Sequence, residues 1–234
     1  MDRLVAFLDE SRKPVRDRVS GRPLEGSEHY LVAAAIMFDG DLTRVRKRIL
    51  RIERDLGFRL HYTSLRKSGR RQAALSAIAD IPDWDALIVE TARPLPIRNN
   101  SERHVRAKVL REALRTLTAT HGVAHVVLET RSSPVKGFRQ LDEQDHQVLQ
   151  SLRSRHEVPA ALSIDHRGKS EPLLAIADLV AGSRTDALCW ADRTAFPIIA
   201  HRVRTTVRVG DALRDAEAPG LRDVADPGRT SAEG

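Results

Sequence analysis

Acidic residues directly follow short apolar runs at three places in the chain, and carboxylates of this kind can bind a cation. Asp9 and Glu10 follow LVAFL, Glu129 follows HVVL, and Asp165 follows ALSI. Each run is too short for a helix and predicts a buried strand, and sites in mixed α/β sheets gather at the carboxyl ends of strands. An acid in such a place can also simply begin a solvated turn. If the first and fourth strands are parallel neighbours, we expect Asp9 and Glu129 to lie side by side.

A further acid, Asp178, lies inside the apolar run PLLAIADLVAG. A charged residue in so apolar a helix is unusual unless it has a partner. At 100° per residue, Glu171, Asp178 and Gly182 share one helix face, and Gly182 would let a backbone or a ligand come close. Two interpretations of Asp178 are open, namely a salt bridge to a nearby arginine and a metal ligand.

A cluster of these carboxylates would need shared protons or a cation, because two carboxylates about 4 Å apart repel by roughly 4 kcal/mol at an effective dielectric near 20. Oxygen ligands favour Mg²⁺ or Mn²⁺ over zinc, and the chain has a single cysteine, Cys189, which rules out a cysteine-rich zinc site. Two such ions about 3.5 to 4 Å apart would activate a water and stabilise the leaving oxygen in phosphodiester hydrolysis. The acids therefore predict metal-dependent hydrolysis of phosphodiester bonds.

The elements that must position these acids follow from the apolar periodicity of the sequence. Because the polar stretch 11–28 carries Pro and Gly and has no helical pattern, it predicts a connection between two antiparallel strands. Strands are predicted over 4–8, 29–38, 84–92, 123–131 and 160–165, and helices over about 40–57, 72–79, 100–122, 143–153 and 171–190.

This order of elements predicts an α/β protein with a mixed five-stranded sheet flanked by helices: three antiparallel-type strands come first, and helices and strands then alternate. It is the order of the ribonuclease H-like fold. We expect one domain over 1–209 with a helical insertion at about 40–82, followed by a disordered tail over 210–234, which lacks apolar periodicity. No stretch approaches the roughly 18 apolar residues of a membrane helix, and the start lacks the apolar core of a signal peptide. A cytoplasmic protein without membrane contact is predicted.

The net charge of +7 favours a polyanionic partner such as nucleic acid. Abundant arginine and alanine are also what a GC-rich genome encodes by default, so the charge leaves both explanations open.

Five stretches, in this order and spacing, resemble the bacterial proteins catalogued as domain of unknown function 3800, a family of the ribonuclease H-like superfamily. They are FLDES, HYLVAAAIM, LHYTSLR, VVLETR and, above all, LLAIADLVAG. The resemblance covers about residues 5–188. It implies that Asp9, Glu129 and Asp178 are the carboxylates of the metal site.

The resemblance is less definite for three other residues. Glu10 and Asp165 would be further ligands, or else turn residues or neighbours of the ligands. His61, in LHYTSLR, matches a position where the family often has histidine, so it would contact phosphate or act as an acid or base, unless it is an ordinary loop residue.

One departure from the family concerns the residues after DES, where a glycine or small residue is usual and this chain has RKP. Arg12 and Lys13 would there grip a phosphate, or pair with the acids in place of metal. The sequence thus predicts a Mg²⁺- or Mn²⁺-dependent nuclease; the alternatives are a catalytically inactive nucleic-acid- or partner-binding module and a hydrolase of a small phosphorylated substrate. The predicted nucleic-acid-binding residues are Arg12, Lys13, Arg66, Lys67, Arg70 and Arg71.

Overall fold

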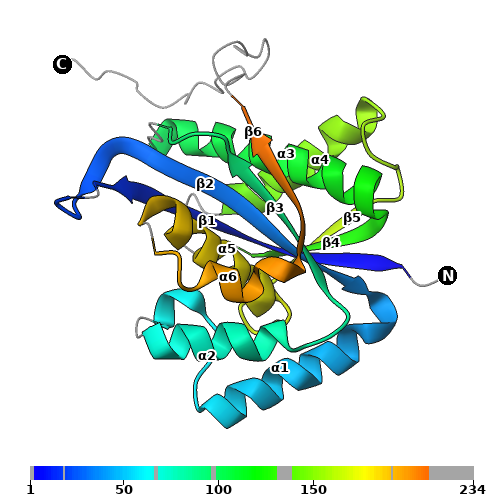
Figure 1. Cartoon of the computed structure of the whole chain (residues 1–234). Coiled ribbons are helices and arrows are strands. Elements are labelled where there is room, and N and C mark those ends of the chain that lie inside the picture. Colours follow the sequence, from blue (N-terminus) through cyan, green and yellow to red (C-terminus); the bar gives the residue numbers. More distant parts are fainter. Residues whose placement is uncertain are drawn as a thin grey trace, which may run out of the picture.

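The computed structural model describes residues 3–17, 19–65, 68–95, 99–130, 139–190 and 192–210. Within these residues a mixed six-stranded sheet of order β5-β4-β1-β2-β3-β6 has helices on both faces (Figure 1). The strands are β1 (Leu4–Arg16), β2 (Pro23–Phe38), β3 (Asp85–Thr91), β4 (Val123–Glu129), β5 (Ser163–Arg167) and β6 (Val203–Val209). The helices are α1 (Leu42–Leu56), α2 (Ser68–Ala79), α3 (Asn99–His121), α4 (Arg139–Ser154), α5 (Leu174–Cys189) and α6 (Phe196–Ile199), with short 3₁₀ turns that include η2 (Tyr62–Ser64).

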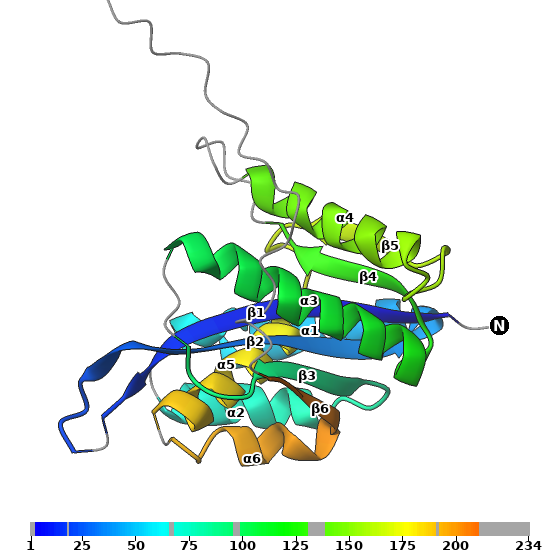
Figure 2. The same cartoon turned by 90° about the horizontal axis from the view of Figure 1, so that it is seen from above.

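β1 and β2 form a long antiparallel hairpin whose pairing runs from Leu4 with Phe38 to Arg16 with Pro23. Its outer end projects from the body of the molecule (Figure 2). The antiparallel pairing was predicted, but the interpretation of 11–28 as a connection was wrong, because most of that stretch is strand. Two strands can satisfy each other's backbone hydrogen bonds without apolar side chains, so apolar periodicity misses them.

The central strands have the expected directions. β1 runs parallel to β4 and antiparallel to β2, which is antiparallel to β3. β5 and β6 extend the sheet as parallel neighbours of β4 and β3. The predicted count of five strands was wrong, because β6 was not predicted. In its sequence, VRTTVRV, three half-buried valines and a half-buried threonine alternate with exposed arginines and a threonine. Of the predicted tail, 211–234 lie outside the described residues.

The helices begin and end where local signals place them. In α1 the buried residues Leu42, Val45, Ile49 and Ile52 recur every three or four positions, and Gly57 ends the helix at φ 71°. α3 stops before a second left-handed glycine, Gly122. α5 starts at Leu174, slightly later than predicted, because the residues before it form a turn. Among the described residues, no helix has the length and apolarity needed to cross a membrane.

Side chains of β1 alternate between two apolar layers, one on each face of the sheet. Val5 and Phe7 pack in the layer under α1, α2 and α5, whereas Ala6 and Leu8 pack in the layer under α3 and α4. The prediction that this strand ends at Leu8 was wrong, because β1 continues to Arg16 through its pairing with β2. Asp9 and Glu10 lie within β1 and continue the alternation, so the side chains of the two adjacent acids point to opposite faces of the sheet. Asp9 is directed to the face of α5, and Glu10 to the face of α3.

Candidate active site

The end of the parallel β1–β4 pair brings two acids together. Leu8 and Leu128 are the last paired residues of these strands, so Asp9 and Glu129 are the next residues on neighbouring strands. Glu129 lies two residues after Val127, which packs in the layer under α5, so its side chain leaves the sheet on the same face as Asp9. That face is covered by α5, which carries Asp178.

The environment of Asp9 disfavours its charge. Burial, followed by the negative charges of Asp178 and Glu129, raises the pKa of Asp9 well above its ordinary value. The hydrogen bond that the Glu10 backbone N–H donates to Asp9 Oδ1 at 2.8 Å opposes this effect only in part. Asp178 and Glu129 are therefore near enough to disfavour the charge of Asp9, and a divalent cation beside Asp9 would offset this effect. Among the described residues, however, the acids and histidine whose possible ligand atoms all lie within 4.8 Å of one another are a different group, Asp142, Asp145 and His166.

Asp178 is held by the segment that follows α1. Its Oδ2 accepts the Tyr62 backbone N–H at 2.7 Å and lies 2.8 Å from His61 Nδ1. Within the described residues its ion-pair partner is His61, so the arginine salt bridge that the sequence left open is not formed.

Tyr62 spans three consecutive turns of α5. Its backbone N–H binds Asp178, its ring covers Gly182, and its hydroxyl donates a 2.6 Å hydrogen bond to the fully buried Asp186. A Cβ at Gly182 would lie 2.2 Å from two ring carbons of Tyr62. The glycine thus makes room for this side chain, rather than for a backbone or a ligand as the sequence suggested.

His61 lies at the partly open edge of the acidic group, with 40% of its side chain exposed. The hydrogen bond with Asp178 raises the pKa of His61, against the opposing effect of burial. Its Nε2 lies 2.8 Å from Thr63 Oγ1. An imidazole held in this way can keep or deliver a proton beside the acids.

Lys169 is a neighbour of the acidic group that the sequence gave no reason to single out. Its Nζ lies 3.6 Å from Glu129 Oε1, and 71% of the side chain is exposed. It follows β5 in the turn RGKS, and only the pairing of β5 with β4 places this turn beside Glu129.

Glu10 belongs to a different group on the opposite face of the sheet. Arg106 of α3 donates to both its carboxylate oxygens, at 3.1 and 3.2 Å, and also binds both oxygens of the buried Asp145. Although burial opposes it, these two acids raise the pKa of Arg106, which stays charged. Glu10 thus neutralises a buried arginine. It also lines one pocket with Asp9, Glu129 and Arg106, and its charge makes a small contribution to the raised pKa of Asp9.

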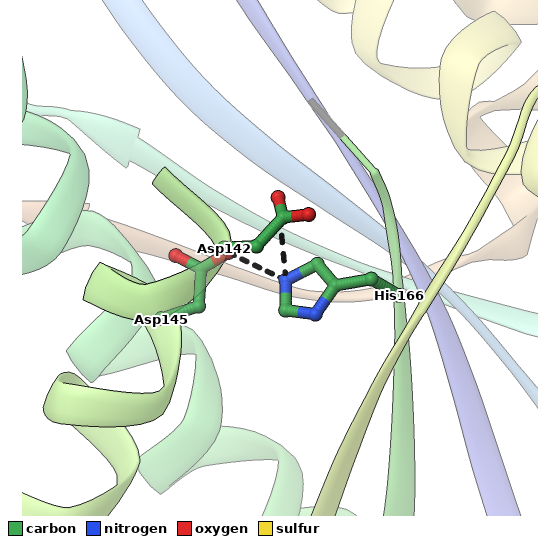
Figure 3. A group of neighbouring side chains, drawn as sticks. All are labelled: Asp142, Asp145 and His166. Carbon is green, nitrogen blue, oxygen red and sulfur yellow. Dashed lines mark hydrogen bonds and ion pairs between the residues drawn. The ribbon is translucent and has the colours of Figure 1, made fainter. Parts of the chain in front are cut away.

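The same network contains three side chains that could hold a metal ion. The possible ligand atoms of Asp142, Asp145 and His166 lie within 4.8 Å of one another (Figure 3). His166 Nε2 lies 3.0 Å from Asp145 Oδ2, and burial alone would raise the pKa of Asp145, but hydrogen bonds from His166 and Arg106 lower it. A cation here would have to compete with the Arg106 guanidinium, so we interpret the group as an ion-pair network.

Asp165 does not end a strand, and that prediction was wrong. β5 runs from Ser163 to Arg167, so Asp165 is its middle residue. Its side chain, 49% exposed, lies 3.6 Å from His125 and 3.5 Å from Arg167. The short apolar run ALSI marked the residues before and at the start of the strand, not its end.

The predicted nucleic-acid-binding residues have other contacts. Arg12 pairs with Glu28 and Glu102, so it does not replace a metal among Asp9, Glu129 and Asp178. Lys13 and Arg71 both bind the buried Asp186, at 2.5 and 3.0 Å, and Arg70 lies over the ring of Phe58. Arg66 and Lys67 lie outside the described residues.

Comparison with known proteins gives a distant structural likeness. No protein-family model and no curated protein matches the chain. A chain in the solved structure of the PCNA:RNase HII complex from Archaeoglobus fulgidus is similar to it, with a TM-score of 0.42 and 18% sequence identity over 80% of this chain and 74% of that chain.

Proposed function

We propose that this α/β protein is a ribonuclease H-like, divalent-metal-dependent nuclease that hydrolyses phosphodiester bonds of nucleic acid, and that it belongs to the family named domain of unknown function 3800. The convergence of Asp9, Glu129 and Asp178 on one face of the sheet carries the proposal. The directions of β1 to β5 support the fold assignment. The first three strands pair in antiparallel fashion, and the next two, β4 and β5, run parallel to β1.

The acids are suited to a hard cation, because they offer carboxylate oxygens and one of them, the partly buried Asp9, has two negative neighbours. Mg²⁺ or Mn²⁺ bound by Asp9, Glu129 and Asp178 would supply the Lewis acidity that phosphodiester hydrolysis needs. The hydrogen bonds from Tyr62 and His61 fix the orientation of the Asp178 carboxylate.

Two further residues would serve the substrate. His61 holds or delivers a proton at the edge of the acidic group, and Lys169, largely exposed beside Glu129, offers its ammonium to a phosphate oxygen.

A catalytically inactive binding module is the second candidate, and these same cations favour it. Protonated His61 neutralises Asp178, and Lys169 lies within ion-pair distance of Glu129. If both pairs persist, the charge available to hold a metal falls, and the scaffold would bind nucleic acid or a partner without cleaving it.

Cleavage assays with the full chain distinguish the two candidates. Single- and double-stranded DNA and RNA are incubated with Mg²⁺, Mn²⁺ or EDTA, and the parent is compared with Asp9→Asn and with Asp165→Asn. We expect metal-dependent cleavage by the parent and by Asp165→Asn, whose carboxylate belongs to His125 and Arg167, and none by Asp9→Asn. Equal cleavage by the parent and Asp9→Asn would reject the proposed site, and tight binding without cleavage by any form would favour the inactive module.

A further inference from the structure

The solvent-facing side of α1 carries a row of basic residues. The buried stripe of the helix consists of Leu42, Val45, Ile49 and Ile52. At 100° per residue the centre of the opposite side holds Arg44, Lys47, Arg51 and Arg54, with Arg48 at its margin. All five are exposed.

Three of these bases have no acidic partner in the part of the chain that the structure describes. Arg44 pairs with Asp41 and Asp83, and Arg54 lies 3.7 Å from the neighbouring Asp55. Lys47, Arg48 and Arg51 form no ion pair with any described residue. Lys47 and Arg51 are four residues apart, a spacing at which like charges destabilise a helix. The row therefore costs helix stability unless a polyanion lies against it.

This row differs from the basic residues that the sequence singled out. Arg12, Lys13 and Arg71 are bound to acids of the fold, so their charges are already neutralised. Leu50, half exposed on the same side of α1, would add an apolar contact.

We propose that the outer side of α1, centred on Lys47, Arg48 and Arg51, binds the phosphate backbone of nucleic acid. From Arg44 to Arg54 the helix rises about 15 Å, which matches about four phosphates of one strand at about 3.4 Å each along the axis. The inference rests on the proposed function for the class of partner and adds the surface that holds it.

Contacts tie α1 to the acidic site. Arg46 of α1 binds both oxygens of Glu171 at 2.9 and 3.1 Å, and Glu171 lies two residues after Lys169, which neighbours Glu129. Beyond the end of α1, His61 contacts Asp178. α1 and α5 pack in the same apolar layer, so the basic row and the acids belong to one side of the sheet.

The experiment measures binding in EDTA, so that cleavage plays no part. Affinities of the full chain for a fluorescent DNA duplex and its single strand are measured over a salt series. The parent is compared with Lys47→Gln/Arg51→Gln and with a control of equal charge change, Lys108→Gln/Arg111→Gln on α3, which packs in the layer on the opposite face of the sheet. Gln has a helix propensity close to that of Lys and Arg, so α1 should stay helical.

Affinity for nucleic acid falls as salt rises, and each phosphate contact adds about 0.9 to the steepness of log affinity against log salt on a duplex and about 0.7 on a single strand. We expect the α1 double variant, which loses two contacts, to show a slope that is less steep by about 1.8 on the duplex and about 1.4 on the single strand. Its melting temperature without nucleic acid should equal or exceed that of the parent, because a like-charge pair is removed. The α3 control should keep the parent slope.

Three results would overturn the inference. Equal losses in the two double variants would show that only net charge matters. An unchanged slope in the α1 variant would place the surface elsewhere and leave the proposed nuclease function standing. A parent that binds phosphatidylserine vesicles but neither DNA nor RNA would reject the nucleic-acid partner and with it the proposed function.

Discussion

Replacing Asp9 by Asn should stabilise the metal-free protein, and the gain should grow with pH. The Asp9 carboxyl is partly buried, and this desolvation and two further acids, Asp178 and Glu129, disfavour its negative charge. Asn keeps the shape of the side chain and its oxygen can still accept the Glu10 N–H. The substitution therefore removes a charge that the folded state disfavours and keeps the local hydrogen bond.

The direction of the pH effect follows from proton linkage. Between the ordinary pKa of 3.8 and the raised value, folded Asp9 holds a proton that the unfolded chain has lost. The free energy of unfolding therefore falls as the pH rises through this window, by up to about 1.4 kcal/mol per pH unit. The free energy of unfolding of Asp9→Asn does not fall in this way. Its excess over the parent is therefore near zero at the ordinary pKa, grows as the pH rises to the raised pKa of Asp9, and is constant above it.

Urea unfolding in EDTA over a series of pH values measures the difference. Asp55→Asn is the control, because this carboxylate lies on α1 with 64% of its side chain exposed to solvent. The control should follow the parent at all pH values. An Asp9→Asn variant that is less stable than the parent at every pH would contradict this prediction, since it would mean that a positively charged side chain already balances Asp9.

Two other substitutions test the packing around the site. Gly182→Ala should destabilise the fold by about 1–3 kcal/mol, because the new Cβ would overlap the Tyr62 ring, and urea unfolding that matches the parent would show that the ring moves freely. Arg106→Met should cost about 3–5 kcal/mol by leaving Glu10 and Asp145 buried without their cation. Adding Glu10→Gln and Asp145→Asn should recover part of the loss in the same assay, and no recovery would contradict the ion-pair network.

Much of the fold could be predicted because its apolar residues follow the periods of helices and strands. The α1 stripe with its Gly57 stop and the parallel neighbours β1 and β4 are examples. The outer half of the β1–β2 hairpin could not be predicted this way, because its stability depends on strand pairing and its side chains are largely polar or basic. β6 was missed although its valines alternate with exposed residues, which is the period of a strand.

Asp9 and Glu129 could be selected from the sequence, because each directly follows a short apolar run. Only Glu129 ends its strand, since β1 continues past Asp9 to Arg16. The ion-pair partners could not be predicted from the sequence, because ion pairs such as Lys13–Asp186 join residues that are far apart in the chain. A weaker signal existed for Asp145, which lies three and four residues before Val148 and Leu149, and so at a buried position of an amphipathic helix. Periodicity shows that such a charge is buried, but it does not show which residue neutralises it.

Calorimetric titration of the full chain with Mn²⁺ measures whether Asp9, Glu129 and Asp178 bind a metal ion. The parent is compared with Glu129→Gln, which changes the proposed metal site, and with His166→Gln, which changes the other group of possible ligands, Asp142, Asp145 and His166. If Asp9, Glu129 and Asp178 hold the metal, the parent and His166→Gln should bind Mn²⁺ alike, and Glu129→Gln should bind it far more weakly. Binding that survives in Glu129→Gln and is lost in His166→Gln, or no binding by the parent at all, would contradict a metal site at Asp9, Glu129 and Asp178.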